Sequence, residues 1–330
     1  MGLKRRSIKK SGWEPLRPGA IVDVVAPASK CSLEELNAGV KVLESWDLQV
    51  RVSPDIFGEN LLHAQDDKIR WQQFRKALLA KDSSVIWCAR GGYGSMKLLP
   101  SLAKMKKPSH SKLLVGLSDI TSLNVFLNQK WKWPVLHAPI LSRVGRGDLP
   151  SDSMDELKQI LFGEKAEVAY DLKPMNQKAK TIRLVKGPLV GGNWATMMAG
   201  LATPFELRPR GTILFLEDVG ERGYKLDRFW EQLSQMKFLD KVSAIIFGDF
   251  TEGNEPNGTS LMWEVLRLRA EAFHKPVYCG IPAGHGSIQR ALPLGLEMQI
   301  VQSKGIIKAS LPTGVSALIA KDHPTGRRGL

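Results

Sequence analysis

The sequence predicts an α/β protein with a parallel sheet in its first half and a smaller mixed domain in its second half. Three observations support this. Short β-branched runs alternate with amphipathic stretches from residue 20 to residue 115, the alternation fades between residues 166 and 180, and a different order of elements follows. Alternating strands and helices are typical of a parallel sheet with helices on both faces. With 330 residues, 43% of them hydrophobic, the chain is long enough for two domains.

The first half begins with a predicted strand at residues 20–26 and a helix at residues 32–43. We expect Ser32 to cap this helix, because Glu35 follows three residues later. Further strands are predicted at 48–52, 84–88 and 113–115, with helices at 66–80 and after Gly94. Loops at the carboxyl ends of parallel strands share one edge of the sheet, so we expect the ligand crevice there.

The second half is predicted to be α+β or α/β, with strand directions left open. We expect a first domain at residues 1–165, an interdomain connection at 166–180 around Pro174 and Asn176, and a second domain at 181–330. Strands are predicted at 211–216, 243–247, near Val277, at 297–301 and at 305–309. Helices are predicted at 227–235 and 261–273.

The chain is strongly basic, with 47 lysines and arginines against 33 acids and a formal charge of +14. Such a surface raises the local concentration of anionic ligands. Its densest basic runs, at residues 4–10 and 104–112, lack the interleaved aromatic residues that stack on bases. We therefore expect solvated surfaces there and no nucleic-acid partner.

The N-terminal residues are basic but are not followed by the apolar stretch of an export signal, which predicts a cytoplasmic protein. No run approaches the ~18 apolar residues that a membrane span needs, so no membrane partner is predicted. Cys31, Cys88 and Cys279 are too few for a disulfide framework or a metal site. We expect them to be buried small side chains, and we predict no metal and no cofactor.

Ser118 is the best candidate nucleophile. An apolar strand runs into Gly116, Leu117, Ser118 and Asp119 and then directly into a helix, the context that exposes a nucleophilic serine. Gly116 relieves crowding at such a turn. The common hydrolase motif has a second glycine two residues after the serine, where this chain has Ile120. The alternative is that Ser118 or Asp119 only caps the helix.

A glycine-rich loop follows the predicted strand at 84–88, with the sequence Arg-Gly-Gly-Tyr-Gly-Ser from Arg90 to Ser95. Backbone N–H groups in such a loop can bind negative charge. The loop could hold a phosphate, or it could supply one oxyanion donor beside the N–H of Asp119. It matches neither the P-loop spacing nor the dinucleotide fingerprint.

A carboxylate and a histidine in the second half could complete the site. Glu217 and Asp218 follow the predicted strand at 211–216, a position that suits an acid that orients a histidine, although an acid there is more often a cap or a surface residue. His285 lies between Gly284 and Gly286 and is the best candidate base. His137 is expected at a strand end, in the core or in the crevice. The remaining histidines are expected at the surface: His63, His110, His274 and His323.

These segments together resemble the LD-carboxypeptidases, also called muramoyl-tetrapeptide carboxypeptidases, and the related microcin-immunity peptidases. The matching blocks occur in the family's order over nearly the whole chain, which is more specific than any one motif. They are VAPAS (25–29), CARGGYGS (88–95), GLSDIT (116–121), GGN (191–193), LFLEDVGERGYKLDR (214–228), IIFGDF (245–250) and GHGSIQRALPLG (284–295).

The resemblance implies a flavodoxin-like N-terminal domain, a smaller C-terminal domain and a homodimer. It also implies a serine peptidase that releases the terminal D-alanine of murein tetrapeptides in cell-wall recycling. Its catalytic residues would be Ser118, Glu217 and His285, with the backbone N–H groups of Gly92 and Asp119 as oxyanion donors. The substrate-binding candidates are Arg90, Gly91, Tyr93 and Arg228, with Arg90 or Arg228 for the terminal carboxylate.

Two positions depart from the family pattern. Arg222 stands where a small residue is usual, and Trp194 stands where an aliphatic residue is usual, so either could reshape the pocket.

Two rival functions remain open. One is hydrolysis of aminoacyl or peptidyl nucleotide amides, as in microcin immunity. The other is a non-enzymatic module that holds a phosphate or nucleotide in the loop at residues 90–95.

Overall fold

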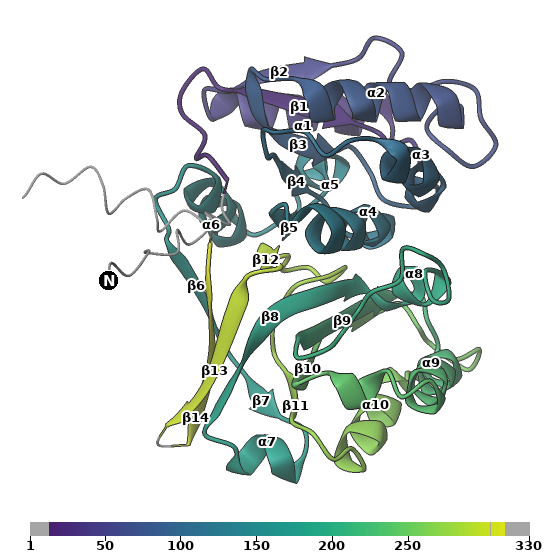
Figure 1. The fold of residues 1–330 in the computed structure, drawn as a ribbon, viewed down its shortest axis with the longest axis vertical. Helices are drawn as coiled ribbons and strands as arrows, with labels where there is room; N and C mark the ends of the chain where they lie inside the picture. Colours follow the sequence, from purple (N-terminus) through teal and green to yellow (C-terminus); the bar gives the residue numbers. More distant parts are fainter. Residues whose placement is uncertain (1–12, 304, 314–330) are drawn as a thin grey trace, which may run out of the picture.

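The computed structural model describes residues 13–303 and 305–313, which form two α/β halves, each built around its own sheet (Figure 1). The basic residues at 4–10 and His323 lie outside the described residues. Within the described ranges, no helix has the length and apolar character required to cross a bilayer.

The first sheet has six strands in the order β12-β5-β4-β3-β1-β2. Strands β1 to β5 are parallel, and their order 2-1-3-4-5 is the flavodoxin-like order, so this prediction is confirmed. The strands are β1 (Ile21–Val25), β2 (Gln49–Val52), β3 (Ser83–Cys88), β4 (Leu113–Val115), β5 (Val135–His137) and β12 (Leu292–Leu294).

Helices connect these strands and cover the sheet. Because parallel crossovers are right-handed, α1 lies on one face and α2 to α4 lie on the other. Ser32 caps α1 as expected, since its hydroxyl accepts the Glu35 N–H at 3.1 Å. The helices of this half are α1 (Leu33–Ser45), α2 (Asp67–Leu79), α3 (Leu99–Lys104), α4 (Thr121–Phe126), α5 (Leu141–Arg146) and α6 (Ser151–Leu161).

The second sheet has eight strands in the order β6-β14-β13-β8-β9-β10-β11-β7, with parallel pairs from β8 to β11 and antiparallel pairs outside them. The strands are β6 (Glu167–Asp171), β7 (Lys173–Pro174), β8 (Leu184–Asn193), β9 (Ile213–Val219), β10 (Ala244–Thr251), β11 (Val277–Cys279), β13 (Glu297–Ser303) and β14 (Ile306–Pro312). The accompanying helices are α7 (Gln177–Thr181), α8 (Trp194–Ala199), α9 (Gly223–Gln235) and α10 (Met262–Glu271).

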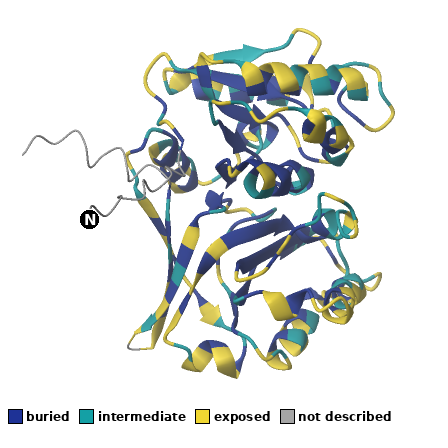
Figure 2. Ribbon diagram, viewed as in Figure 1, coloured by how far each residue is buried: buried dark blue, intermediate teal, exposed yellow. Residues whose placement is uncertain are grey.

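The buried residues concentrate in the central strands of both sheets (Figure 2). Fully buried runs such as Leu113–Val115 explain why these parallel strands have continuous apolar sequences. Cys31 and Cys88 are buried, as expected, whereas Cys279 is only partly buried. Burial raises the pKa of the Cys31 thiol to about 11.

The expected connection at residues 166–180 is regular rather than irregular. It contains the edge strands β6 and β7 and the beginning of α7, and β6 buries every second side chain as an edge strand does. β6 has only five residues, so its alternation is short beside Pro174 and the lysines that follow it. In addition, β12 comes from the C-terminal half but pairs with β5 in the first sheet, so the chain returns to the first sheet after β11 and leaves it again before β13. The division into domains 1–165 and 181–330 stays a prediction.

Candidate active site

Ser118 lies at a sharp turn between β4 and the helix that follows. It opens the 3₁₀ turn η2 (Ser118–Ile120) with a φ of 66°, a left-handed conformation that is rare and strained outside glycine. Gly116 permits the turn, because a Cβ there would lie only 3.1 Å from the Cβ of Cys88. The half-buried hydroxyl is therefore held in the strained geometry of a nucleophile elbow.

The helix-cap alternative does not match the hydrogen bonds. Neither Ser118 nor Asp119 caps the turn with its side chain. The Asp119 carboxylate instead accepts the backbone N–H of Ser95 at 2.7 Å, and the Ser95 hydroxyl donates to the Asp119 carbonyl at 2.5 Å. The two polar side chains thus join the serine turn to the glycine-rich loop.

The glycine-rich loop packs directly against Ser118. A Cβ at Gly91 would lie 2.7 Å from the Ser118 Cβ and 3.0 Å from its Oγ, so only glycine leaves the serine in place. Gly92 has a φ of +92° and backs onto Ser29, whose hydroxyl accepts the Tyr93 N–H at 3.1 Å. The VAPAS block therefore supports the loop that carries the predicted oxyanion donor.

The same loop is poorly suited to a phosphate. The Ser95 N–H already donates to the buried Asp119 carboxylate at 2.7 Å. Burial raises the pKa of Asp119, and the hydrogen bonds of Ser95 oppose the rise because they favour the charged form. An internal carboxylate thus occupies a donor that a phosphate would need, which argues against the phosphate-binding module.

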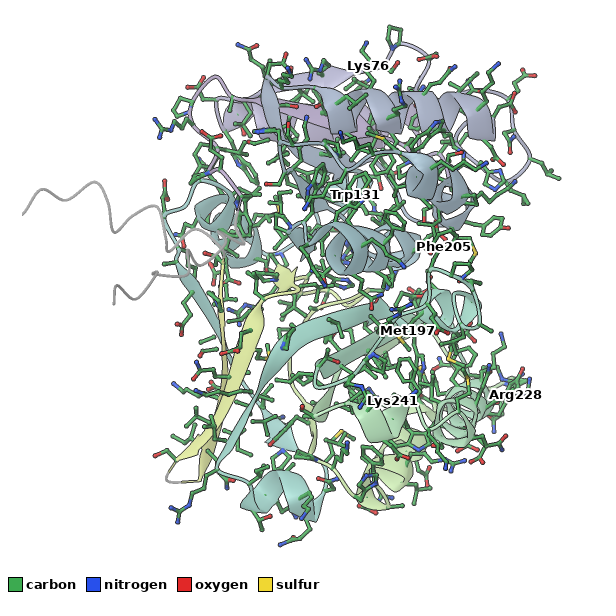
Figure 3. The ribbon with its side chains drawn as sticks, in the orientation of Figure 1. Lys76, Trp131, Met197, Phe205, Arg228 and Lys241 are labelled. Carbon is green, nitrogen blue, oxygen red and sulfur yellow. The ribbon has the colours of Figure 1, made fainter. Side chains whose placement is uncertain are left out.

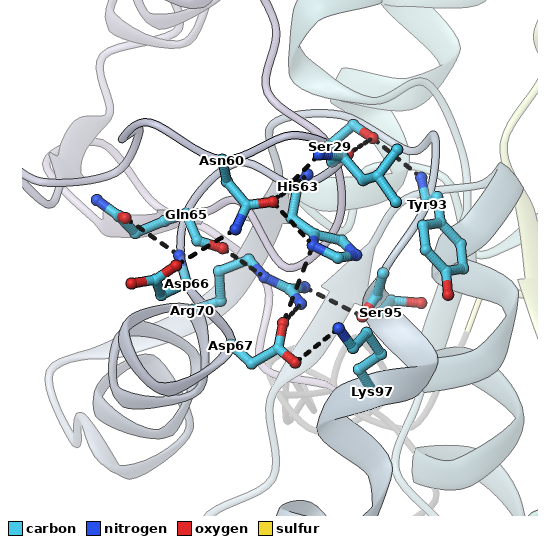
Figure 4. Close-up of polar contacts among 12 residues, drawn as sticks. Ser29, Asn60, His63, Gln65, Asp66, Asp67, Arg70, Tyr93, Ser95 and Lys97 are labelled. Carbon is cyan, nitrogen blue, oxygen red and sulfur yellow. Dashed lines mark hydrogen bonds and ion pairs between the residues drawn. The ribbon is translucent and has the colours of Figure 1, made fainter.

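A buried arginine that the sequence did not single out anchors this loop (Figure 4). Arg70 on α2 is 1% exposed and donates to the carbonyls of Pro27 and Gly94, the latter at 3.0 Å. Its other partners are the Gln65 carbonyl, at 3.1 Å, and the Asp67 carboxylate, at 2.5 Å. Arg70 therefore ties together the loops after β1 and β3. A buried position in the helical pattern was its only sequence signal.

His63 is buried, so its expected surface location was wrong. The ring is 5% exposed and lies 5.2 Å from the Tyr93 ring, and Nδ1 lies 3.1 Å from the Asn60 Oδ1 (Figure 4). Burial lowers the pKa of His63, and the nearby charge of Arg70 lowers it further. Polar neighbours in the sequence suggested exposure, but they fold over the ring as a loop.

Glu217 and His285 form a buried pair in the second half. The Glu217 Oε2 lies 2.7 Å from the His285 Nδ1, and the Glu217 side chain is 0% exposed. Glu217 lies inside β9 rather than after it, since the strand continues to Val219. Burial alone would lower the pKa of His285, but the charge and hydrogen bond of Glu217 raise it.

The two glycines beside His285 make this pairing possible. Gly284 has a φ of +132°, and a Cβ there would lie 2.7 Å from the Glu217 Oε2. A Cβ at Gly286 would lie 2.7 Å from the Asp249 Oδ2. The histidine loop can therefore approach both acids only because glycine stands on each side of the imidazole.

Two further acids lie close to this pair. Burial, reinforced by the charge of Glu217, raises the pKa of Asp218 to about 7. Burial also raises the pKa of Asp249 to about 6. Asp218 has a structural role, because its carboxylate accepts the Asn193 side-chain amide at 2.8 Å and the Ala195 N–H at 2.8 Å.

The two halves are joined beside the candidate residues. Thr121, three residues after Ser118, accepts the buried Asn193 N–H at 3.0 Å. Asn193 is in turn the β8 partner of Glu217 on β9. Gly192 permits this approach, since a Cβ would lie 2.6 Å from the Thr121 Oγ1. The GGN block therefore links the serine helix to the strand of the Glu217–His285 pair.

His137 lies at the end of β5, as expected, and close to the Glu217–His285 pair. It is fully buried, and its ring lies 5.4 Å from the ring of Phe215. Burial lowers the pKa of His137 to about 4, opposed by the charge of Glu217 and helped by that of His285.

Comparison with known proteins matches both halves of the chain to one family. Residues 22–138 match the LD-carboxypeptidase N-terminal domain and residues 186–300 match the LD-carboxypeptidase C-terminal domain. A putative carboxypeptidase of Rickettsia conorii is 34% identical over 284 residues, which cover 86% of this chain and 88% of the relative. The chain belongs to the LD-carboxypeptidase family. It is accordingly a hydrolase of the serine carboxypeptidase class.

Two further relatives of this LD-carboxypeptidase have names that state a substrate. The murein tetrapeptide carboxypeptidase of Pseudomonas aeruginosa is 28% identical, over 86% of this chain and 93% of its own. The crystal structure of muramoyltetrapeptide carboxypeptidase from Oxalobacter formigenes superposes with a TM-score of 0.76 at 26% identity. That match covers 88% of this chain and 98% of the other.

The two candidate arginines of this LD-carboxypeptidase differ in position. Arg90 is exposed at the beginning of the glycine-rich loop and donates to the Lys30 carbonyl at 2.7 Å. Tyr93, in the same loop, is 47% exposed. Arg228 lies on α9 at the outer edge of the molecule (Figure 3), and its guanidinium lies 5.4 Å from the centre of the Tyr224 ring. Within the described residues, no side-chain hydrogen bond or ion pair joins Arg228 to the candidate site.

Arg222 and Trp194, the two residues that depart from the family pattern, contact residues of the C-terminal half and not Ser118. Arg222 donates to the Glu255 carboxylate at 2.8 Å and lies over the Tyr224 ring at 4.9 Å. Trp194 is fully buried and stacks on Phe247, with 6.3 Å between the ring centroids. Both side chains therefore serve the packing of the C-terminal half of this LD-carboxypeptidase.

Proposed function

We propose that this LD-carboxypeptidase releases the terminal D-alanine of murein tetrapeptides in cell-wall recycling, by acyl transfer from Ser118. The observation that carries the proposal is the buried Glu217–His285 pair, with 2.7 Å between Oε2 and Nδ1. The strained turn at Ser118 and the Thr121–Asn193 link support it, because they bring the serine turn to the strand of that pair.

The proposed roles follow from this hydrogen bond. When the His285 Nδ1–H donates to Glu217, Nε2 is left as the proton acceptor. His285 then takes the Ser118 proton while the hydroxyl oxygen attacks the carbonyl carbon of the L-configured residue before D-alanine. The N–H groups of Gly92 and Asp119 are the proposed donors to the oxyanion.

The second half of the reaction restores the enzyme. His285 gives its proton to the amine of the departing D-alanine as the C–N bond breaks, which leaves an acyl ester on Ser118. Water, deprotonated by His285, attacks this ester, and the proton returns to the Ser118 oxygen as the tripeptide leaves. Each step is a proton or acyl transfer, so the reaction needs no reactant besides the peptide and one water molecule.

Arg90 is the better candidate for the terminal carboxylate. It belongs to the loop whose Gly91 packs against Ser118, and its side chain is exposed at that edge. Arg228 stays a weaker proposal, because its guanidinium lies over Tyr224 on α9. Gly91 and Tyr93 are proposed to border the same binding site, and the net charge of +14 favours an anionic muropeptide.

The decisive experiment compares Ser118→Ala with Ser122→Ala, a serine four residues further on, in α4. D-alanine release from murein tetrapeptide is expected to fall by about 10⁴-fold or more in Ser118→Ala and to stay near the original rate in Ser122→Ala. A fluorophosphonate should label the original protein and Ser122→Ala but not Ser118→Ala. Undiminished release by Ser118→Ala would rule out the serine mechanism.

The substrate assignment has its own test. A peptidyl nucleotide amide, the substrate class of the related microcin-immunity peptidases, is assayed beside the tetrapeptide. Faster turnover of the tetrapeptide supports the proposal, whereas equal or faster turnover of the nucleotide amide replaces it with the immunity-type function. The Ser118 labelling distinguishes this outcome from failure of the mechanism itself.

The homodimer and the cytoplasmic location are also proposals. The homodimer is implied by the resemblance to the family, and analytical ultracentrifugation should find twice the mass of 36.6 kDa. For the proposed location, cell fractionation should recover the protein with cytoplasmic markers.

A further inference from the structure

A cavity lies between the two halves, away from the candidate active site. Its volume is about 660 Å³, within the range of small-molecule sites. It is lined by the π-helical turn η3 (Leu127–Trp131) and the residues after it, by the segment before β9, and by the turn between β12 and β13. Both halves of the molecule therefore contribute to it.

The cavity and the candidate active site are at opposite ends of shared elements. Thr212 in the cavity precedes β9 and Glu217 lies five residues further on, which corresponds to roughly 16 Å of strand. Gln129 in the cavity is on the helical segment that begins at Ser118, and eleven residues correspond to roughly 16 Å of helix. A ligand here would not touch the scissile bond.

The side chains that line the cavity carry an excess of positive charge. Four exposed cations line it: Lys130, Lys132, Arg208 and Arg210. Within the described residues, none of the four makes an ion pair with a carboxylate. The acid in the lining is Glu206, whose carboxylate accepts the Ala202 N–H at 3.1 Å. Positive charges gathered around one small volume favour an anion within it.

The wall of the cavity is held by specific hydrogen bonds. The Gln129 side chain accepts the Arg208 N–H at 2.6 Å and donates to the Glu206 carbonyl at 3.1 Å. The Asn128 amide donates to the Leu294 carbonyl at 3.4 Å. These bonds fix the π-helical turn against both neighbouring segments, and π-helical turns are frequent at functional sites.

We propose that this cavity binds a small polyanion that carries at least two phosphate or carboxylate groups. Lys130 and Lys132 come from the N-terminal half, whereas Arg208 and Arg210 come from the C-terminal half. A ligand with two anionic groups can engage both pairs, and it then joins the two halves that carry Ser118 and Glu217. The proposal is independent of the substrate proposed above.

The test is isothermal titration calorimetry of the full chain with inorganic pyrophosphate and, separately, with citrate. The variant Arg208→Gln/Arg210→Gln removes two cations and leaves the backbone bond to Gln129 intact. We expect its affinity to be about tenfold weaker or more, as for the loss of charge-assisted hydrogen bonds. The matched control is Arg75→Gln/Lys76→Gln on α2, at the far end of the molecule (Figure 3), and should bind unchanged.

A second measurement does not depend on the double variant. Trp133 lines the cavity and is 2% exposed, and its indole N–H signal is identified in a ¹H–¹⁵N spectrum by its absence in Trp133→Phe. Pyrophosphate or citrate should shift this signal in the original protein. Tighter binding of pyrophosphate indicates a phosphate ligand, and tighter binding of citrate indicates a polycarboxylate.

Three outcomes would overturn the proposal. The first is the absence of heat and of any Trp133 shift with either anion. The second is equal weakening in both double variants, which would show a general effect of net charge. The third is a lower sedimentation mass for Arg208→Gln/Arg210→Gln without anion binding by the original protein, which would make the cavity an interface between two copies.

Discussion

The carboxylate of Glu217 holds the imidazole of His285, with 2.7 Å between Oε2 and Nδ1. This bond fixes the orientation of a ring that two flanking glycines leave otherwise unconstrained. Burial works against a charged His285, but the Glu217 charge prevails and raises its pKa. The pair therefore controls both the tautomer and the protonation of the proposed base.

Replacing Glu217 with Gln should separate these two effects. Turnover should fall by about 10⁴-fold, because the amide can favour the wrong tautomer of His285. The acidic limb of the pH–rate profile should move to lower pH, because removal of the carboxylate charge lowers the pKa of His285. Profiles of kcat/KM measured from about pH 5 to about pH 9 check both expectations.

The control for that experiment is Glu221→Gln, in the same sequence block. It removes a 3.0 Å ion pair with Lys225 and should leave the acidic limb unchanged. An unshifted limb in Glu217→Gln, or an equal shift in both variants, would contradict the assigned role of Glu217.

Replacing Gly91 with Ala should displace Ser118. The new Cβ would lie 2.7 Å from the Ser118 Cβ, so one of the two loops must move. A displacement on the order of 1 Å costs about 100-fold in turnover. Gly200→Ala, whose Cβ would have 3.3 Å to its nearest neighbour, should stay near the original rate. Equal rates for the two alanine variants would remove Gly91 from the site.

Thr121 should prove essential to the alignment of the halves. In Thr121→Val the buried Asn193 N–H loses its acceptor, which should cost about 1–3 kcal/mol of stability and reduce turnover. Thr121→Ser restores the hydroxyl and should recover most of both. Thermal melting and D-alanine release measure the two effects, and a serine variant no better than valine would show that the hydroxyl is not the cause.

Asp249 should make the fold less stable at higher pH. Burial raises its pKa from 3.8 to about 6 in the folded state. The folded state therefore binds this proton more tightly than the unfolded chain does, and protonation of Asp249 stabilises the fold. This stabilisation is lost as the pH rises through about 6. Asp249→Asn does not titrate, so its melting temperature should improve relative to the original protein between about pH 4 and about pH 7 and stay level above that. The surface variant Asp171→Asn should show no such trend, and a trend as large as that of Asp249→Asn would contradict the prediction.

The parallel core of the first sheet could be predicted because its signals are local. Strands such as Leu113–Val115 are short apolar runs, and Ser32 with Glu35 marks a helix start. The edge strands β6 and β12 could not be found in the same way. Their pairing depends on partners more than 120 residues away, since β6 pairs with β14 and β12 pairs with β5.

The residues of the candidate site also differ in whether their signals are local in the sequence. Ser118 and His285 could be proposed because a serine turn and a glycine-flanked histidine have recognisable surroundings, whereas Glu217 also needed the resemblance of the ordered sequence blocks to one family. Arg70 and Thr121 were missed because their importance comes from hydrogen bonds to Gly94 and Asn193, which lie in other segments of the chain. The only sequence signal for Arg70 is its position four residues before Phe74, on the apolar face of the helical pattern.

The position of β12 has a consequence for how the protein is made. Until residue 294 has left the ribosome, the nascent N-terminal half has an unpaired edge at β5, whose N–H and C=O groups are open to other chains. Translation of the last third of the message therefore closes a sheet begun in the first third. A prematurely terminated chain would expose that edge and should be prone to aggregation.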